Sequence, residues 1–273
     1  MKRPSFWGLH AEVPKALKWG LGVLPFIAIV VFYLIASDIR HKENEYDKLL
    51  PTPTQILSAV DRVAFSEDKR TGEYLLWQDS AASLKRLFIG VLAAAVLALL
   101  LGLNMAMFEG LNSFFYSFIT FISMIPPLAI LPILFISFGV DEFAKIFLIF
   151  IGIFPIVTRD IYISVKKIPK EQSIKALTLG ASQLGVVYRI ILPQIMPRLL
   201  DAIRLSLGSA WLFLIASEAI AASEGLGYRI FLVRRYLAMD VILTYVVWIT
   251  LIGFVFDLVL RMIVKHFYPW YVK

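Results

Sequence analysis

The stretch LKRLFIGVLAAAVLALLLGLNMAM, residues Leu84–Met107, has two charged side chains near its start and none in the rest. A helix needs about 20 apolar residues to cross a hydrocarbon core of roughly 30 Å. The whole chain of 273 residues is 59% hydrophobic, against about 45–50% in an ordinary soluble domain. Because the excess is concentrated in runs of this kind, the sequence predicts an integral membrane protein.

Five further apolar runs accompany this one, and together the six occupy most of the chain. They lie at about Leu17–Ala36, Leu111–Phe138, Phe143–Ile163, Leu199–Ala222 and Val241–Val264. We therefore expect an all-α polytopic membrane protein with about six transmembrane helices and no separate catalytic domain. Residues 1–83 would form an N-terminal helix with a polar connection that holds an amphipathic segment at Ile56–Phe65, and residues 84–273 the core.

A cleaved signal peptide is the alternative interpretation of the first run. A long lead precedes that run, and no small-x-small cleavage site follows it before Asp38 and Arg40, so an uncleaved helix is the simpler interpretation.

Charge and composition exclude several classes of site. The net charge is +7, but the basic residues collect between apolar runs and act as topology signals rather than as a nucleic-acid surface. The chain has no cysteine, which excludes disulfides and thiolate chemistry. Its three histidines, His10, His41 and His266, are scattered and predict no metal site.

Lysine and arginine placement predicts the orientation of the chain, because cytoplasmic loops carry an excess of both. Six spans put both termini on one side. That side holds the following basic residues: Lys2, Arg3, Lys15 and Lys18, those from Arg159 through Arg204, and Arg261, Lys265 and Lys273. The opposite side holds basic residues too, Lys85 and Arg86 among them. We expect both termini in the cytoplasm.

The connection between the fourth and fifth runs reads KEQSIKALTLGASQLGVVYRIILPQIMPRLLDAIR, Lys170–Arg204. Its apolar residues fall at helical spacing on either side of Gly180, whose lack of a side chain permits a sharp turn. We expect two short helices that meet at this glycine outside the bilayer and end at Pro193 and Pro197. An apolar face there fits a groove on a partner protein or the surface of the membrane.

Gly180, nine further residues and then IILP at 190–193 resemble the cytoplasmic signature of bacterial ABC importer permeases. The resemblance covers about Leu84–Trp270 and implies a MetI-like core whose coupling helix docks into a cleft of an ATPase subunit. The docking residues that it implies are Ile174, Lys175, Ala176, Leu177, Gly180, Ala181, Leu192 and Pro193. The family's Glu-Ala-Ala is Ile174-Lys175-Ala176 here, so no glutamate salt bridge to the ATPase can be carried over.

Further stretches resemble the nitrate/sulfonate/taurine group of these permeases. They are LLPTPTQI after the first run, SLKRLFIG from Ser83, SMIPPLAILPILFISFGV from Ser123, SEAIAASEGLGYRI from Ser217 and FYPW near the C-terminus. The resemblance implies a bacterial inner-membrane protein that works with a second copy of itself, two ATPase subunits and a periplasmic solute-binding protein. ATP and Mg would bind the ATPase subunits, and this chain, which lacks a P-loop motif, would hold no cofactor.

Several residues inside the runs are candidates for the solute path. A carboxylate at membrane depth is costly, so Glu218 either reaches interfacial water or a partner, or lies on the path or in a gate. Ser209 and Ser217 supply small residues suited to helix packing or to a pore, and Pro126 and Pro127 either bend a helix or break one along the path. An unpaired Glu218 would repel anions, which keeps a cationic or ureido solute such as guanidinium open beside the small anion.

Two other classes of membrane protein remain as alternatives. A secondary transporter or channel would show internal repeats or a proton relay, and neither is visible. A membrane enzyme would need a catalytic constellation, but the sequence contains neither H-E-x-x-H nor G-x-S-x-G.

Overall fold

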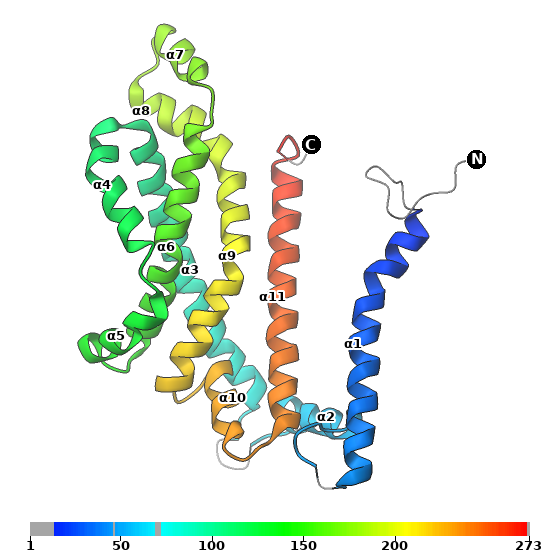
Figure 1. Ribbon diagram of the computed structural model, residues 1–273. Helices are drawn as coiled ribbons and strands as arrows, with labels where there is room; N and C mark the ends of the chain where they lie inside the picture. Colours follow the sequence, from blue (N-terminus) through cyan, green and yellow to red (C-terminus); the bar gives the residue numbers. More distant parts are fainter. Residues whose placement is uncertain (1–13, 46, 69–71, 272–273) are drawn as a thin grey trace.

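The computed structural model describes residues 14–45, 47–68 and 72–271, and this part of the chain is helical throughout its regular structure (Figure 1). Five helices are long and apolar enough to cross a membrane, or six if one bent pair counts as a span. The five are α1 (Lys15–Glu43), α3 (Leu75–Met107), α6 (Glu142–Lys166), α9 (Leu192–Ala221) and α11 (Met239–Phe267). The expected all-α polytopic architecture is confirmed, while Lys2, Arg3, His10 and Lys273 lie outside the described residues.

The centre of the bundle is the contact between α3 and α6, the most extensive of any helix pair. Small residues recur every four positions on the buried face of α3: Gly90, Ala94, Ala98 and Gly102. A Cβ added at Gly90 would lie 2.9 Å from Ile149, and one at Gly102 would lie 2.7 Å from the carbonyl oxygen of Thr158. Small residues at this spacing let two helix backbones approach closely, which is how membrane helices gain packing energy.

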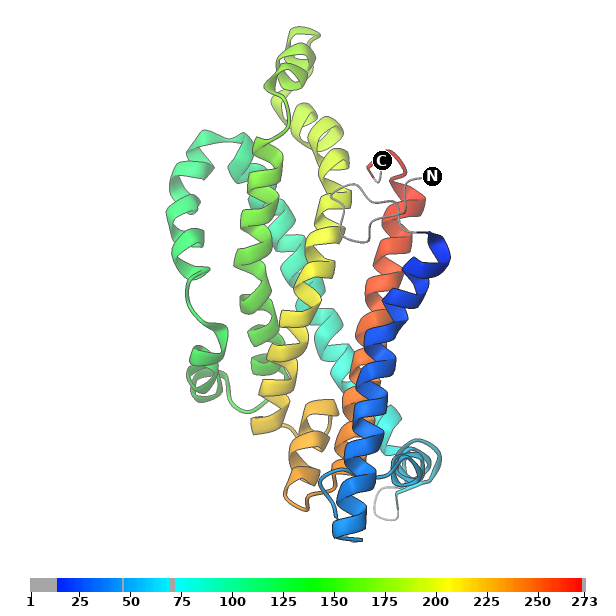
Figure 2. The same ribbon diagram turned by 45° about the vertical axis from the view of Figure 1, so that its right-hand side comes forward.

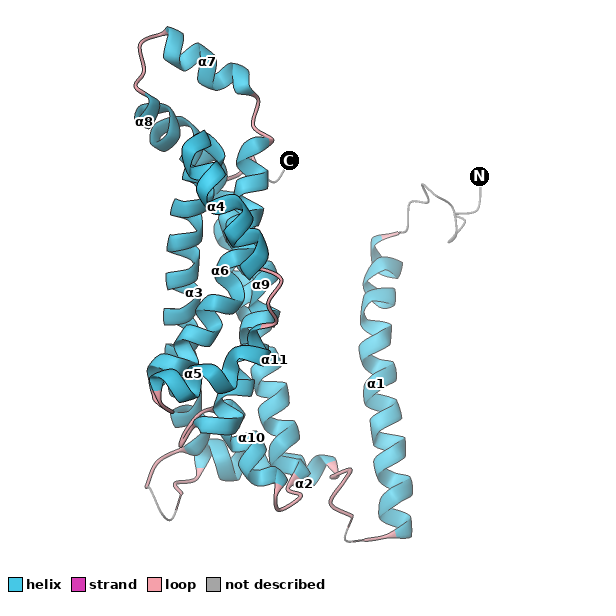
Figure 3. Cartoon of the chain, turned by 60° about the vertical axis from the view of Figure 1, so that its left-hand side comes forward, coloured by secondary structure: helices cyan, strands magenta, loops and turns pink. Residues whose placement is uncertain are grey.

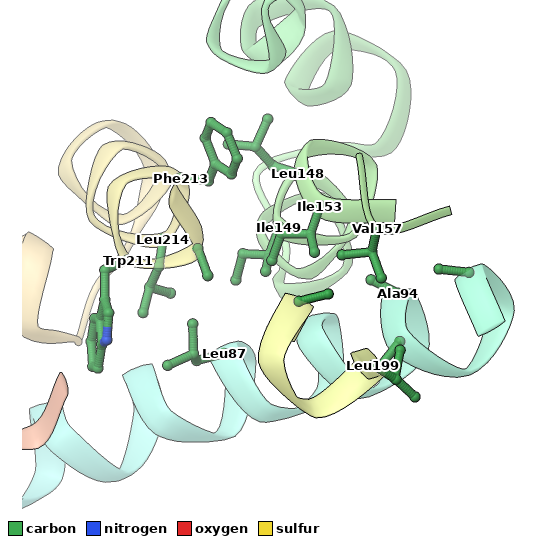
Figure 4. Close-up of a cluster of buried hydrophobic side chains, with 14 of the residues drawn as sticks. Leu87, Ala94, Leu148, Ile149, Ile153, Val157, Leu199, Trp211, Phe213 and Leu214 are labelled. Atoms are coloured by element: carbon green, nitrogen blue, oxygen red, sulfur yellow. The ribbon is translucent and has the colours of Figure 1, made fainter. Parts of the chain in front are cut away.

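Helix α9 packs against both α6 and α3, and a third glycine permits its close approach to α6. A Cβ at Gly152 of α6 would lie 2.2 Å from the ring of Phe213 on α9. Phe213, Leu214 and Ile153 belong to the core that α3, α6 and α9 share (Figure 4).

Helix α1 stands away from this bundle (Figure 3). Only 6% of its most apolar window is buried, and its side chains are exposed along most of its length. It is joined to the rest by a connection that holds α2 (Pro53–Val60) and the π-helical η1 (Asp61–Phe65). Thr52 begins α2 with a reciprocal capping box to Gln55, so the expected amphipathic segment is helical and starts three residues earlier.

The third predicted span is not one continuous helix. It consists of α4 (Glu109–Ile122), a 3-10 turn η2 (Pro127–Ile130) and α5 (Leu131–Phe138), with a bend of 82°. Pro126 and Pro127 lie at the break, and Pro126 has extended backbone angles. A proline cannot donate a backbone hydrogen bond and disfavours helix in the residue before it, so two in succession end α4.

The fifth span begins earlier than predicted, and Pro193 and Pro197 do not end a separate helix. The short α8 (Gln183–Gly185), the π-helical η3 (Val186–Ile191) and α9 follow one another without a break. Pro193 is the second residue of α9, which follows directly on the π-helical η3, so it lies within a continuous helical segment. Pro197 lies inside the helix and is buried there.

The two ends of the bundle differ in what they hold (Figure 2). One end carries α7 (Lys170–Thr178), the start of α1 and the end of α11. The opposite end carries α2 and α10 (Leu226–Arg234). We call these the α7 end and the α10 end.

Candidate functional site

Helix α7 projects beyond the bundle and buries none of its residues. Its two large apolar side chains are exposed, Ile174 at 61% and Leu177 at 44%. Leu179 and Leu184, on either side of the following turn, are 86% and 60% exposed. A cluster of exposed apolar side chains of this kind, outside the spanning helices, indicates a contact with another molecule.

A glycine corner fixes the direction of α7. Gly180 has φ +88°, a left-handed conformation that other residues adopt only under strain. The N–H of Gly180 donates to the carbonyl oxygen of Leu177 at 3.0 Å, and that of Ala181 donates to Ala176 at 3.0 Å. This pair of bonds is the Schellman motif that ends a helix, so the sequence prediction of a turn at Gly180 is confirmed.

The far side of the corner is anchored in the bundle. Ser182 caps α8 by accepting a hydrogen bond from the N–H of Gly185 at 3.0 Å. Val187 and Ile191 of η3 are buried, and Gln194 of α9 donates to the side chain of Gln172 in α7 at 3.0 Å. The segment is therefore a rigid arm with an exposed apolar tip.

The other predicted coupling residues divide along this arm. Lys175 is exposed on α7, whereas Ala176 and Ala181 are partly buried at the corner. Leu192 and Pro193 lie at the start of α9, so their place is at the base of the arm and not at its tip.

At the α10 end, a group of charged and hydroxyl-bearing residues, most of them buried, joins four helices. We call it the polar clasp, and its members are Asp79, Ser83 and Arg86 of α3, Glu142 and Lys145 of α6, Glu218 of α9 and Arg229 of α10. Three acids face three bases, so the clasp is neutral overall. A buried charge is tolerated only when it is paired and hydrogen-bonded, and each of these is.

Glu218 is completely buried, and its carboxylate is fully engaged. Arg86 donates to Glu218 at 2.7 Å, and the hydroxyl of Ser83 donates at 2.7 Å. The backbone N–H of Gly227 supplies a further bond at 2.9 Å. The carboxylate thus ties the end of α9 to α3 and to the start of α10.

Arg86, which is 1% exposed, connects Glu218 to a second acid. Its Nε and Nη2 atoms donate to the two carboxylate oxygens of Glu142 at 2.5 and 2.8 Å. Lys145 also donates to Glu142 at 2.8 Å. The bidentate geometry is the strong form of an arginine–carboxylate contact.

Asp79 holds the remaining half of the clasp. It accepts from Arg229 at 2.7 Å, from the hydroxyl of Tyr245 at 2.8 Å and from the N–H of Gly225 at 2.9 Å. Burial lowers the pKa of Arg229, but the hydrogen bond and charge of Asp79 outweigh it, so that the pKa of this arginine lies above its ordinary value.

The backbone of the clasp depends on Gly225, which has φ +126°. A Cβ there would lie 2.6 Å from the carboxylate of Glu218. Close approach to Glu218 is therefore a reason for glycine at this position that the sequence did not reveal.

The other predicted path residues lie apart from one another. Ser217 is buried and donates to the carbonyl oxygen of Leu214 at 2.8 Å, whereas Ser209 is exposed and lines a cavity between α6 and α9. Pro126 and Pro127 lie at the break between α4 and α5, where Arg159 of α6 donates to the hydroxyl of Ser123 at 2.9 Å. Thus the structure brings Glu218 into the clasp but does not bring the five candidates together.

Sequence reasoning missed the role of Asp79, Ser83 and Arg86. The signal was available, because these three polar residues recur at spacings of four and three and so lie on one face of a helix. In the described part of the chain, no group of three or more histidine, aspartate or glutamate side chains is placed to hold a metal ion.

Comparison with known proteins supplies relatives and a matching fold. The chain is 34% identical to the taurine transport system permease protein TauC of Escherichia coli (strain K12), over 81% of this chain and 80% of the relative. It is 30% identical to the putative aliphatic sulfonates transport permease protein SsuC of the same organism, over 93% and 94%. It is 29% identical to the nitrate import permease protein NrtB of Leptolyngbya laminosa, over 75% and 73%.

A solved structure of the MetNI methionine ABC transporter in an inward facing conformation matches the fold, with a TM-score of 0.63 at 19% identity. The match covers 72% of this chain and 98% of that one. The family model described as binding-protein-dependent transport system inner membrane component matches residues 87–273. By this match and these relatives, the chain belongs to the family of binding-protein-dependent transport system inner membrane components, the permeases of ABC transporters.

Proposed function

We propose that the chain is the membrane-spanning permease subunit of an ATP-driven importer of a small anion. The observation that carries the proposal is the exposed apolar tip of α7, held outside the bundle by the Schellman corner at Gly180. An amphipathic helix with no intramolecular partner is suited to a groove on another protein.

The partner of α7 is an ATPase subunit, and each of two permease copies binds one. ATP and Mg bind those subunits, which supply the free energy of transport. The α7 end, with both termini, then faces the cytoplasm, and the α10 end faces a periplasmic solute-binding protein. The family membership and the MetNI fold match support this assembly.

The solute class follows from two observations. The relatives are named as permeases for taurine, aliphatic sulfonates and nitrate. Glu218, which would repel an anion if it faced the path alone, is neutralised by Arg86. The electrostatic reason for a cationic or ureido solute is therefore weak.

Uptake by the complete assembly tests the proposal. The chain is reconstituted in liposomes with its ATPase and its binding protein, and uptake of radiolabelled taurine, an alkyl sulfonate and nitrate is measured with and without internal ATP. We expect uptake of at least one of these anions, dependent on ATP and on the binding protein. Uptake that proceeds equally without ATP would favour the alternative, a secondary transporter or channel.

A further inference from the structure

A cavity of about 230 Å³ lies between α6 and α9. Gly152 and Asp160 of α6 line it on one side, and Arg198, Ser206 and Ser209 of α9 line it on the other. Arg198 and Ser209 are 11 residues apart on one helix, so the cavity extends for about 16 Å along the bundle. We call it the α6–α9 groove.

The groove runs from mid-membrane toward the α7 end. Ser209 is near the middle of α9, which spans Leu192–Ala221, and Arg198 lies in its second turn. Ile156 and Leu205, 52% and 70% exposed, lie at its edge. The groove therefore runs along the bundle, the direction in which a transported solute would move.

Its lining differs from that of other cavities along the spanning helices. The cavity bounded by α3, α9 and α11 is lined by apolar side chains such as Leu87 and Phe256, and that between α1 and α11 by residues such as Val30 and Leu251. Such surfaces suit lipid chains or another helix. Here the hydroxyl of Ser206 donates to the carbonyl oxygen of Ala202, but that of Ser209 lies at mid-span without a bond to any described residue, and such a polar group is costly to keep there unless the groove holds water or a polar solute.

The polar groups of the groove favour an anion. Arg198 uses two of its five N–H groups on Asp160, the Nε bond being 2.9 Å long, and it also interacts with the hydroxyl of Tyr271, which leaves N–H groups over. The hydroxyl of Ser209 makes no hydrogen bond to any residue that the structure describes, and it is exposed to the groove. A donor at mid-span and a cation at the inner end are thus both available to a negatively charged group.

We propose that the α6–α9 groove is the inner half of the solute path and that it binds a small anion, first at Ser209 and then at Arg198. The proposal rests on the function proposed above and names the surface that carries it out. Asp160 neutralises Arg198 while the groove is empty. Because this carboxylate competes with the solute for the guanidinium, binding stays weak enough for the anion to leave at the α7 end.

Cysteine accessibility tests the groove directly, because the chain has no cysteine of its own. Ser209→Cys is compared with Phe254→Cys, a 63% exposed position on α11 away from the groove, each in the complete complex in liposomes. The probe is a membrane-impermeant methanethiosulfonate that carries a sulfonate. We expect it to modify Ser209→Cys about tenfold faster than Phe254→Cys, and a transported sulfonate to slow only the former.

Equal, slow modification at both positions, in complexes that still take up the anion with ATP, would overturn the groove while leaving the proposed function intact. ATP-independent uptake would overturn the proposed function instead, and the modification rates would still report on the groove.

A second test addresses Arg198. The double variant Asp160→Asn with Arg198→Gln removes the cation without leaving a bare carboxylate. Because a hydrogen bond to a charged group is lost, we expect the KM for the anion to rise about tenfold while the ATPase still co-purifies. Arg198→Lys with Asp160 intact should change KM less. An unchanged KM in the double variant would contradict the assignment of Arg198.

Discussion

The two ends of this bundle differ in where their polar and apolar side chains lie. At the α10 end, seven charged or hydroxyl-bearing residues of four helices are joined by hydrogen bonds, and all of them except Glu142 and Arg229 are buried. At the α7 end, leucine and isoleucine side chains face outward on α7, none of whose residues is buried. Polar groups inside and apolar groups outside are each costly in an isolated soluble protein. The first end is therefore held together by its own contacts, whereas the second has the exposed apolar surface that we propose a partner covers.

The comparison predicts that substitutions at the α10 end reduce stability, whereas those at the α7 end reduce coupling. The largest expected effect is that of Arg86→Ala. It leaves the buried carboxylate of Glu218 without its cation, a change that costs about 3–5 kcal/mol in comparable sites. We expect a folded yield in mild detergent far below that of the unaltered chain, measured by fluorescence-detected size exclusion.

The control for this prediction is the double variant Arg86→Met with Glu218→Gln. It removes both charges and should restore much of the yield, because replacing a buried pair costs less than breaking one. If Arg86→Ala folds as well as the unaltered chain, the clasp is not what holds the α10 end.

Gly225→Ala is the next largest change. Its Cβ would lie 2.6 Å from the carboxylate of Glu218, at a φ of +126°. Strain of this kind costs about 1–3 kcal/mol, so we expect a lower thermal midpoint in detergent. Gly22→Ala is the matched control, since nothing lies within 4 Å of its added Cβ, and a similar fall in both variants would speak against a role for the clasp geometry.

Gly180→Val tests the corner at the α7 end. A β-branched residue in the left-handed region costs about 1–2 kcal/mol or more, which should reorient α7 without disturbing the bundle. We expect an unchanged thermal midpoint together with loss of ATP-dependent uptake. Gly180→Asn is the control, because asparagine tolerates this conformation and should retain most uptake. A fall in the thermal midpoint of Gly180→Val would show that the corner supports the fold.

The smallest expected effect concerns pH at the α10 end. The hydrogen bond from Arg40 holds the pKa of Asp47 below its ordinary value, against the opposing effect of burial. A depressed folded-state pKa contributes stability above the unfolded value of about 3.9 and loses it as the pH falls through the folded value. We expect the thermal midpoint to fall slightly more between pH 5 and pH 3 in the unaltered chain than in Asp47→Asn. An identical fall in the two proteins would show that the Arg40–Asp47 pair does not stabilise the fold.

Local patterns made much of this molecule predictable. Hydropathy located the spanning helices, and the glycine at 180 predicted the corner, because apolar length and backbone conformation are properties of short stretches. The orientation of the termini and the domain division at residue 83 stay predictions. The sequence also suggested that Pro193 and Pro197 end a helix, which was wrong because proline is tolerated within a membrane helix where neighbours compensate for the lost hydrogen bond.

Contacts between residues far apart in the chain could not be predicted from the sequence. Glu218 and Arg86 are separated by 132 positions and Tyr245 and Asp79 by 166, so no local spacing reports their contact. The sequence singled out Glu218 as a costly charge, but only the packing of α3 against α9 and α10 shows what offsets that cost. The same holds for Ser209, whose place in a groove depends on α6.

Co-purification tests whether an ATPase subunit binds α7. The tagged chain is extracted in mild detergent from cells that express the ATPase, in three forms: unaltered, Leu177→Asp and Leu177→Met. We expect the ATPase to be recovered with the unaltered chain and with Leu177→Met, and to be lost from Leu177→Asp although the thermal midpoint of that variant is unchanged. Equal recovery of the ATPase with Leu177→Asp would contradict the account.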